Sequence, residues 1–279
     1  MTGTLYLCAT PIGNLGDITV RVIEILKSVD IIAAEDTRNT IKLLNHFDIK
    51  TPMTSYHQHN MDTKGPSLIE KLKEGKNIAL VTDAGMPGIS DPGEDMAKRC
   101  RRENIPVTIA PGASAGISAL VLSGMEARRY VFEGFLPSDK KERQNVLKNL
   151  EKETRTTVFY EAPHRLTDTL SVLLKSAGDR EAAAVREITK RYEEVRHGTI
   201  SSLLEYYREN PPKGEFVIII GGVSQSVLRQ EEIDSWNSIS IEEHMKKYTD
   251  TGMSEKEAMK KVSKDRGVSK REIYAYLNR

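Results

Sequence analysis

The 279-residue chain has only two cysteines, Cys8 and Cys100, which lie far apart and belong to no Cys-x-x-Cys pair or Cys/His cluster. This scarcity argues against a disulfide framework and a zinc site, and it fits a reducing compartment. No apolar run approaches the roughly 18 residues that a membrane helix needs, and residues 1–3 show no signal-peptide pattern. We therefore expect a cytoplasmic protein without a membrane segment or a metal site.

Neither sign of charge predominates, since the formal net charge is +1. This balance argues against a protein that coats polyanions with its whole surface, so any contact with nucleic acid would depend on local patches. Two glycine-rich nucleotide motifs are also missing, Gly-x-Gly-x-x-Gly and Gly-x4-Gly-Lys-Ser/Thr. Nicotinamide enzymes and nucleoside triphosphatases are therefore poor candidates.

Four unusual loops follow short strand-forming runs in the first part of the chain. The runs are separated by helical patterns, which predicts a mostly parallel sheet, and they cover residues 5–10, 31–34, 78–81 and 107–110. The loop at 82–93 contains three glycines and two prolines, which permit close backbone approach to a ligand and stiffen the chain. Because ligands bind at the carboxyl edge of such sheets, these loops predict a binding site.

A second unit is expected after residue 112. Its predicted strands cover 130–135, 156–160, 182–186, 194–197 and 216–220, and its predicted helices cover 142–151, 164–174 and 200–207. The short spacing between the third and fourth strands indicates a hairpin, so this sheet is expected to be mixed. We interpret 56–60 as an exposed loop and 225–240 as a polar linker.

The C-terminal segment 235–279 is predicted to be a separate helical module. Two Ser-x-x-Glu capping boxes, at 254–257 and 269–272, mark two helix starts. Gly267 provides the turn between them, and the apolar faces comprise Ala258, Met259, Val262, Ile273, Tyr276 and Leu277. The pattern is typical of a helix-turn-helix, and Lys270 and Arg271 open its second helix. Nucleic-acid contact is favoured here over a small helical cap.

Seven segments carry a resemblance to a known family. In chain order they are ATPIGNLGDIT, AEDTR, TDAGMPGISDPG, PGASA, GFLP, FYEAPHR and REITKRYEE. This series resembles the tetrapyrrole methylase superfamily of S-adenosylmethionine-dependent methyltransferases. ATPIGN, TDAGxPxISDPG and YEAPHR are similar to its branch that methylates the 2′-hydroxyl of a cytidine in 16S rRNA.

The resemblance implies two α/β domains, at 1–112 and 113–224, with the methyl donor S-adenosylmethionine in the cleft between them. It also implies a homodimer that acts on the small ribosomal subunit. The residues that match positions around the donor are Pro11, Asp83, Ala84, Gly85, Met86, Ile89, Ser114, Ala115, Glu161 and Ile188.

Charged residues at the strand ends are expected to serve the substrate. They are Glu35, Asp36, Arg38, Arg165 and Lys190. The cations suit phosphates and the carboxylates suit a ribose hydroxyl. An ordinary surface salt-bridge cluster is the competing interpretation. For the basic run at 98–102, a solvated helix face is favoured over contact with RNA.

Two other functions stay open at this point: a tetrapyrrole (precorrin-type) methyltransferase, and a ligand-sensing protein that binds nucleic acid. ATPIGN, YEAPHR and the helical module favour RNA over a macrocycle. The dense set of ligand loops favours an enzyme over a sensor.

Overall fold

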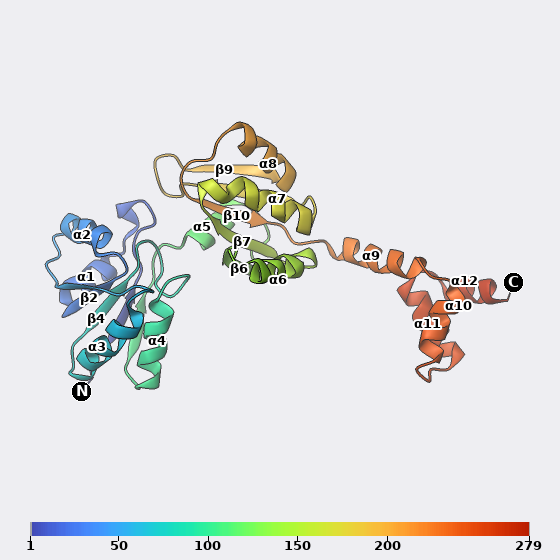
Figure 1. Cartoon of the computed structure of the whole chain (residues 1–279), viewed down its shortest axis with the longest axis horizontal. Helices are drawn as coiled ribbons and strands as arrows, with labels where there is room; N and C mark the ends of the chain where they lie inside the picture. Colours follow the sequence, from blue (N-terminus) through green and yellow to red (C-terminus); the bar gives the residue numbers. More distant parts are fainter. Residues whose placement is uncertain (1, 279) are drawn as a thin grey trace.

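The computed structural model describes residues 2–278, which form two five-stranded sheets and a C-terminal group of helices (Figure 1). The helices that follow the second sheet, orange and red in Figure 1, lie apart from both sheets. This arrangement confirms the predicted α/β fold with one parallel sheet, one mixed sheet and a C-terminal helical module.

The first sheet is parallel throughout, in the spatial order β3-β2-β4-β1-β5. Its strands are β1 (Leu5–Cys8), β2 (Ile31–Ala34), β3 (Met53–Ser55), β4 (Ile78–Val81) and β5 (Val107–Ala110). The connecting helices are η1 (Leu15–Asp17), α1 (Val20–Ser28), α2 (Thr37–His46), α3 (Met61–Lys73) and α4 (Gly93–Arg102). Since β2, β4 and β1 are neighbours, the loops after them leave one edge of the sheet side by side.

Both faces of this sheet are buried. Ile78 and Leu80 of β4 pack with residues of α3 and α4, whereas Ala79 and Val81 pack with residues of α1 and α2. Strands that are covered on both faces read as continuous apolar runs, which is why β4 shows no alternation in the sequence. Burial raises the pKa of the Cys8 thiol to about 12 and that of Cys100 to about 11, so both behave as small apolar core side chains.

The second sheet is mixed, in the order β6-β7-β10-β8-β9, with only the β6–β7 pair parallel. Its strands are β6 (Tyr130–Phe135), β7 (Thr156–Glu161), β8 (Glu181–Arg186), β9 (Glu194–Thr199) and β10 (Phe216–Ile220). Its helices are α5 (Ala115–Leu122), α6 (Lys140–Glu151), η2 (Pro163–Arg165), α7 (Leu166–Ala177) and α8 (Ile200–Glu209). The predicted hairpin is confirmed as β8–β9, and α5 packs on β7 and β10.

Three sequence predictions for the sheets were wrong in detail. The first strand ends at Cys8 rather than Thr10, and the three-residue β3 was missed. Tyr56 does not belong to an exposed loop, because it is 1% exposed and its hydroxyl donates to Asp95 Oδ2 at 2.5 Å. The basic run in α4, by contrast, forms a solvated helix face as predicted: Lys98, Arg101 and Arg102 are exposed, and Arg99 Nε lies 2.5 Å from Asp95 Oδ2 of the same helix.

The C-terminal module contains four helices: α9 (Gln225–Asn237), α10 (Ile241–Thr249), α11 (Glu255–Asp265) and α12 (Lys270–Leu277). The predicted linker at 225–240 is therefore wrong, because most of it is α9. Both predicted capping boxes are confirmed, and a third one, Ser240 with Glu243, starts α10. The core of the module contains Met245, Ala258, Val262 and Ile273, whereas Tyr276 is 43% exposed instead of lying in the core.

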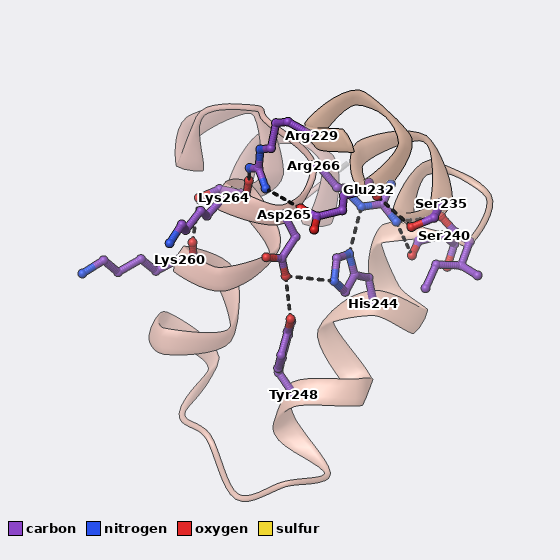
Figure 2. A network of polar contacts seen from close by, with 12 residues as sticks. Arg229, Glu232, Ser235, Ser240, His244, Tyr248, Lys260, Lys264, Asp265 and Arg266 are labelled. Carbon is purple, nitrogen blue, oxygen red and sulfur yellow. Dashed lines mark hydrogen bonds and ion pairs between the residues drawn. The ribbon is translucent and has the colours of Figure 1, made fainter. Parts of the chain in front are cut away.

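A buried polar network connects α10 with the end of α11 (Figure 2). Arg266 donates from Nε to His244 Nδ1 at 3.2 Å and from Nη2 to the carbonyls of Ile239 and Ser240 at 2.6 and 2.8 Å. Asp265 accepts a 2.5 Å hydrogen bond from the Tyr248 hydroxyl. Because His244 Nδ1 accepts from a guanidinium, the fully buried imidazole is the neutral tautomer with its proton on Nε2.

Acid should therefore weaken this module. Burial and then the charge of Arg266 lower the pKa of His244 below 6.5, with Asp265, on the Nε2 side, opposing them and Lys247 assisting. As the pH falls below about 6.5, the unfolded chain takes up a proton that the folded module does not, so the free energy of unfolding should decrease by up to about 1.4 kcal/mol per pH unit.

The measurement is urea unfolding between pH 7.5 and 5.0, followed by the fluorescence of Trp236. This residue is the only tryptophan of the chain and stacks on His244 with a centroid distance of 3.9 Å. His244→Phe should abolish most of the pH dependence, and His46→Gln, a change at an exposed histidine, should leave it intact. Equal slopes in wild type and His244→Phe would contradict the assignment.

Candidate functional site

A cleft of about 580 Å³ lies between the loop edge of the first sheet and the second sheet. It is bounded on one side by the loop after β4 and on the other by β7, β8 and β10. Nine of the ten residues predicted for the donor line it, together with Glu35 and Lys190: Asp83, Ala84, Gly85, Met86, Ile89, Ser114, Ala115, Glu161 and Ile188.

Backbone pairing joins the first loop to the glycine-rich loop. Thr10 N donates to Gly85 O at 2.9 Å, and Gly85 N donates to Thr10 O at 3.1 Å. The Thr10 hydroxyl also donates to Thr82 O at 3.1 Å. Gly85 has φ of +84°, and a Cβ there would lie 3.3 Å from Ile12 Cγ2. A side chain at this position would therefore be strained and would press on the wall of the cleft.

Asp91 fixes the rest of the glycine-rich loop. Its carboxylate accepts hydrogen bonds from the amides of Gly88, Ile89 and Gly93, at distances between 2.7 and 3.2 Å. Burial raises the pKa of Asp91, and these three amides offset part of that rise. Ser90 inside this loop has φ of +65°, a conformation that side chains rarely adopt. The loop is thus held in one shape by internal hydrogen bonds.

Aromatic side chains form part of the opposite wall. Tyr160 of β7 lines the cleft and packs edge-on against Phe132 and Phe135, with centroid distances of 5.0 and 5.7 Å. Its hydroxyl accepts from Gly116 N at 3.1 Å, and burial raises its pKa. The wall can therefore offer a flat apolar surface to a ligand without changing charge at neutral pH.

A buried carboxylate ends β7. Glu161 is 2% exposed and accepts from the Thr169 hydroxyl at 2.5 Å and from Ala162 N at 2.8 Å. Arg165 Nε lies 3.5 Å from Glu161 Oε1, and Arg165 Nη2 donates to Leu136 O at 2.7 Å. Arg165 therefore supports Glu161 and the turn after β6, and it is not among the residues that line the cleft.

Lys190 lies on the same wall between two carboxylates. Its Nζ is 2.9 Å from Glu187 Oε1 and 2.8 Å from Glu215 Oε2. Burial alone would lower the pKa of Lys190, but these two hydrogen bonds outweigh it and raise the pKa. A Cβ on Gly13 would approach Lys190 Cγ to 2.4 Å, so the first loop packs directly on this lysine. Lys190 is consequently a fixed positive charge beside the cleft.

Besides Arg165, three other predicted site residues do not line the cleft. Pro11 lines an adjoining hollow of about 620 Å³, which shares Ile12, residues 82–84, Lys190 and Glu215 with the cleft. Asp36 caps α2 and binds Arg38 at 2.7 Å, which holds the pKa of Asp36 at about 2. Neither Asp36 nor Arg38 lines the cleft or the hollow, so they form the local ion pair that the competing interpretation described.

Glu35 differs from its neighbours in the same loop. Its Oε2 accepts from the Thr82 hydroxyl at 2.6 Å and from Asp83 N at 3.3 Å. Among the residues that the structure describes, none donates a hydrogen bond to its Oε1. Glu35 thus has one oxygen that fixes the loop and one without a hydrogen-bond donor, and its side chain lines the cleft.

The sequence prediction missed several lining residues. Phe135 and Tyr160 belong to motifs that had already been recognised, GFLP and YEAPHR, so the signal was present. No sequence signal indicated Glu215 and Val217, which reach the cleft because β10 lies beside β7 and β8.

Across residues 2–278 there is no group of three or more acidic, cysteine or histidine side chains that could hold a metal ion. Within the same range, none of the helices has the length and apolar character to cross a bilayer.

The family is decided by a sequence comparison over most of the chain. Residues 4–204 match the family described as Tetrapyrrole (Corrin/Porphyrin) Methylases. The chain belongs to this family. As in the sequence analysis, the methylase motifs lie at the loop edge of the first sheet and on the facing strands of the second.

Curated members of this methylase family align over nearly the whole chain. A protein of Halalkalibacterium halodurans named "Ribosomal RNA small subunit methyltransferase I" is 50% identical over 98% of this chain and 93% of its own length. Proteins of the same name from Bacillus subtilis and Synechocystis sp. are 48% and 44% identical, again over 98% of this chain.

Solved methylase structures share the fold at lower identity. Diphthine synthase superposes with a TM-score of 0.64 and 15% identity, covering 78% of this chain and 90% of its own. Uroporphyrin-III-C-methyltransferase from Thermus thermophilus gives a TM-score of 0.57 and 19% identity, covering 78% of this chain and 94% of its own. At these identities the likeness establishes the fold alone.

Proposed function

We propose that this methylase is a cytoplasmic enzyme that transfers a methyl group from S-adenosylmethionine to the 2′-hydroxyl of a cytidine in the 16S rRNA of the small ribosomal subunit. One observation carries the choice of RNA. Relatives named for ribosomal RNA align over 98% of the chain, whereas the match to the family ends at residue 204 and the solved methylases cover 78%. The relatives that align over the C-terminal helices as well are the ones named for ribosomal RNA, and this supports RNA as the proposed substrate.

The cleft has the chemistry that this donor needs. S-adenosylmethionine has a flat adenine, a ribose and an amino-acid end, and it is recognised by hydrogen-bonding edges and apolar walls more than by strong charge. In this proposal the backbone N–H and C=O groups of residues 82–86 form hydrogen bonds with the donor, and Tyr160 provides an apolar face. Ile89 and Ile188 line the remaining space. The donor brings the electrophilic methyl, and the chain provides binding and orientation.

We assign the substrate side to two of the charged residues that line the cleft, Lys190 and Glu35. Methyl transfer requires in-line approach of the nucleophile, so the main task is positioning. Lys190 keeps its proton because Glu187 and Glu215 hold it, and it suits an RNA phosphate. The Oε1 of Glu35 is assigned to orient the ribose hydroxyl, and this carboxylate or a water then receives the proton.

We expect Gly85→Val to reduce donor affinity more than tenfold. Valine is strained at φ of +84°, and its side chain would enter the space beside Ile12. Calorimetry with S-adenosylmethionine measures the effect. Gly124→Val is the matched control, because Gly124 also has positive φ, +66°, but a Cβ added there would meet no atom within 4 Å. Equal donor affinity in folded Gly85→Val and wild type would remove this loop from the donor site.

Incubation with radiolabelled donor and small ribosomal subunits tests the reaction. We expect a single ribose methyl in 16S rRNA, identified by mass mapping and by resistance to alkaline cleavage at the 3′ phosphodiester. Lys190→Met should lower turnover with little change in donor affinity, because its ammonium is assigned to the RNA. A methyl on a base, on a tetrapyrrole, or on no RNA would overturn the assignment.

The proposal includes a homodimer. The segment from β5 to β6 leaves six apolar side chains exposed in the single chain: Val107, Ile109, Ile117, Val121, Leu122 and Tyr130. Soluble monomers rarely expose such sets of side chains, and a twofold partner could cover them.

Val121 is the most exposed of them, at 70%. Val121→Asp should therefore convert the dimer into a monomer in sedimentation experiments. Val227→Asp, a change at an exposed valine of α9, is the control and should leave the dimer intact. A wild-type protein that sediments as a monomer at micromolar concentration would refute the dimer.

A further inference from the structure

We propose that the exposed face of α12, formed by Lys270, Arg271 and Tyr274, binds an unpaired segment of the small-subunit rRNA at a distance from the methylated nucleotide. The inference rests on the proposed function and extends it to a second RNA-binding surface. In Figure 1 the module that carries α12 lies apart from the two sheets that form the cleft.

The module carries many exposed cations that are not paired with a carboxylate. Seven lysines and Arg271 are exposed on its last three helices, and within residues 2–278 none of them has a carboxylate within 4.0 Å: Lys246, Lys247, Lys256, Lys260, Lys261, Lys264 and Lys270. Unpaired cations are available to phosphates.

The acidic side chains of the module are mostly occupied. Glu243, Glu257 and Glu272 accept from the N-cap amides of their own helices. Asp265 is bound by Tyr248 in the interior network (Figure 2). These carboxylates therefore stabilise helix starts and the interior network, and over residues 241–278 nine lysines and arginines stand against seven acidic side chains.

Helical spacing places the three proposed residues on one face. Lys270 and Arg271 precede Tyr274 by four and three positions, so their side chains are neighbours, whereas Ile273 points into the core. The Tyr274 side chain is 60% exposed. An exposed ring one helical turn after two cations suits a base stacked on the ring with its phosphates on the cations. Paired RNA offers no free base face, so the geometry favours an unpaired segment.

The interior network holds α12 in place. Arg266, which is 8% exposed, ties the turn before α12 to the start of α10 through the carbonyls of Ile239 and Ser240. Gly267 in this turn has φ of +65°, and a Cβ there would lie 2.9 Å from Ile233 of α9. Consequently α9 packs against the turn, and the α12 face has a fixed orientation relative to the helix that leads back to the body.

The inference is tested by measuring the affinity of two double variants and two single variants for deproteinised 16S rRNA and for small ribosomal subunits. Lys270→Ala with Arg271→Ala should weaken RNA binding about tenfold at 0.1 M salt. Because two phosphate contacts are lost, the slope of log affinity plotted against log salt concentration should become shallower by roughly 1.5. Tyr274→Ala should weaken binding about tenfold through lost stacking, and Tyr274→Phe should bind like wild type because it keeps the ring.

Lys140→Ala with Lys141→Ala is the control, since it removes the same charge from an exposed turn of α6. It should change neither affinity nor slope. In the α12 variants KM for RNA should rise while kcat at saturating RNA and donor affinity stay within twofold, because α12 is not part of the cleft.

Two outcomes would overturn the inference while leaving the proposed function intact. One is normal methyl transfer with unaltered affinity and slope in folded α12 variants. The other is a loss of binding to subunits but not to deproteinised rRNA, which would assign the face to a ribosomal protein. Absence of methyl transfer by the wild type would instead refute the proposed function. Trp236 fluorescence confirms that each variant is folded.

Discussion

The cleft depends on two backbone hydrogen bonds between Thr10 and Gly85. They join loops from the adjacent parallel strands β1 and β4, and each satisfies a main-chain group that would be costly to bury unpaired. The pairing fixes the glycine-rich loop at one end, and Asp91 fixes it at the other. The first wall of the site is thus built from main chain whose shape depends on few side chains.

Much of this architecture could be predicted because its signals are local. A strand followed by a loop rich in glycine and proline predicts the sheet edge, and the Ser-x-x-Glu boxes at Ser254 and Ser269 predict helix starts. The same rule applied to Ser240 would have predicted α10. Nine of the positions predicted for the donor lie together because they belong to segments that the strand order brings to one cleft.

The errors arose where contacts between residues far apart in the sequence determine the local structure or the position of a side chain. The sequence of α9 has no apolar stripe, and none of its residues is fully buried, so no helical periodicity marks it in the sequence. The helix is held by contacts between distant residues, such as the stacking of Trp236 on His244. For Asp36 and Arg38 the sequence shows the charges but not the side-chain rotamers, which turn the two groups toward each other. Glu215 reaches the cleft only because of the order of strands in the second sheet.

Helix α9 has a further consequence as a spacer. Its 13 residues are about 20 Å long, and its Trp236 and Ile233 contact α10 and the turn between α11 and α12. Under the proposed function, binding of one RNA segment in the cleft would make the second contact, at α12, intramolecular, with an effective concentration on the order of millimolar. Two contacts that are each weak can then give high avidity for the intact subunit and still allow stepwise release of the product.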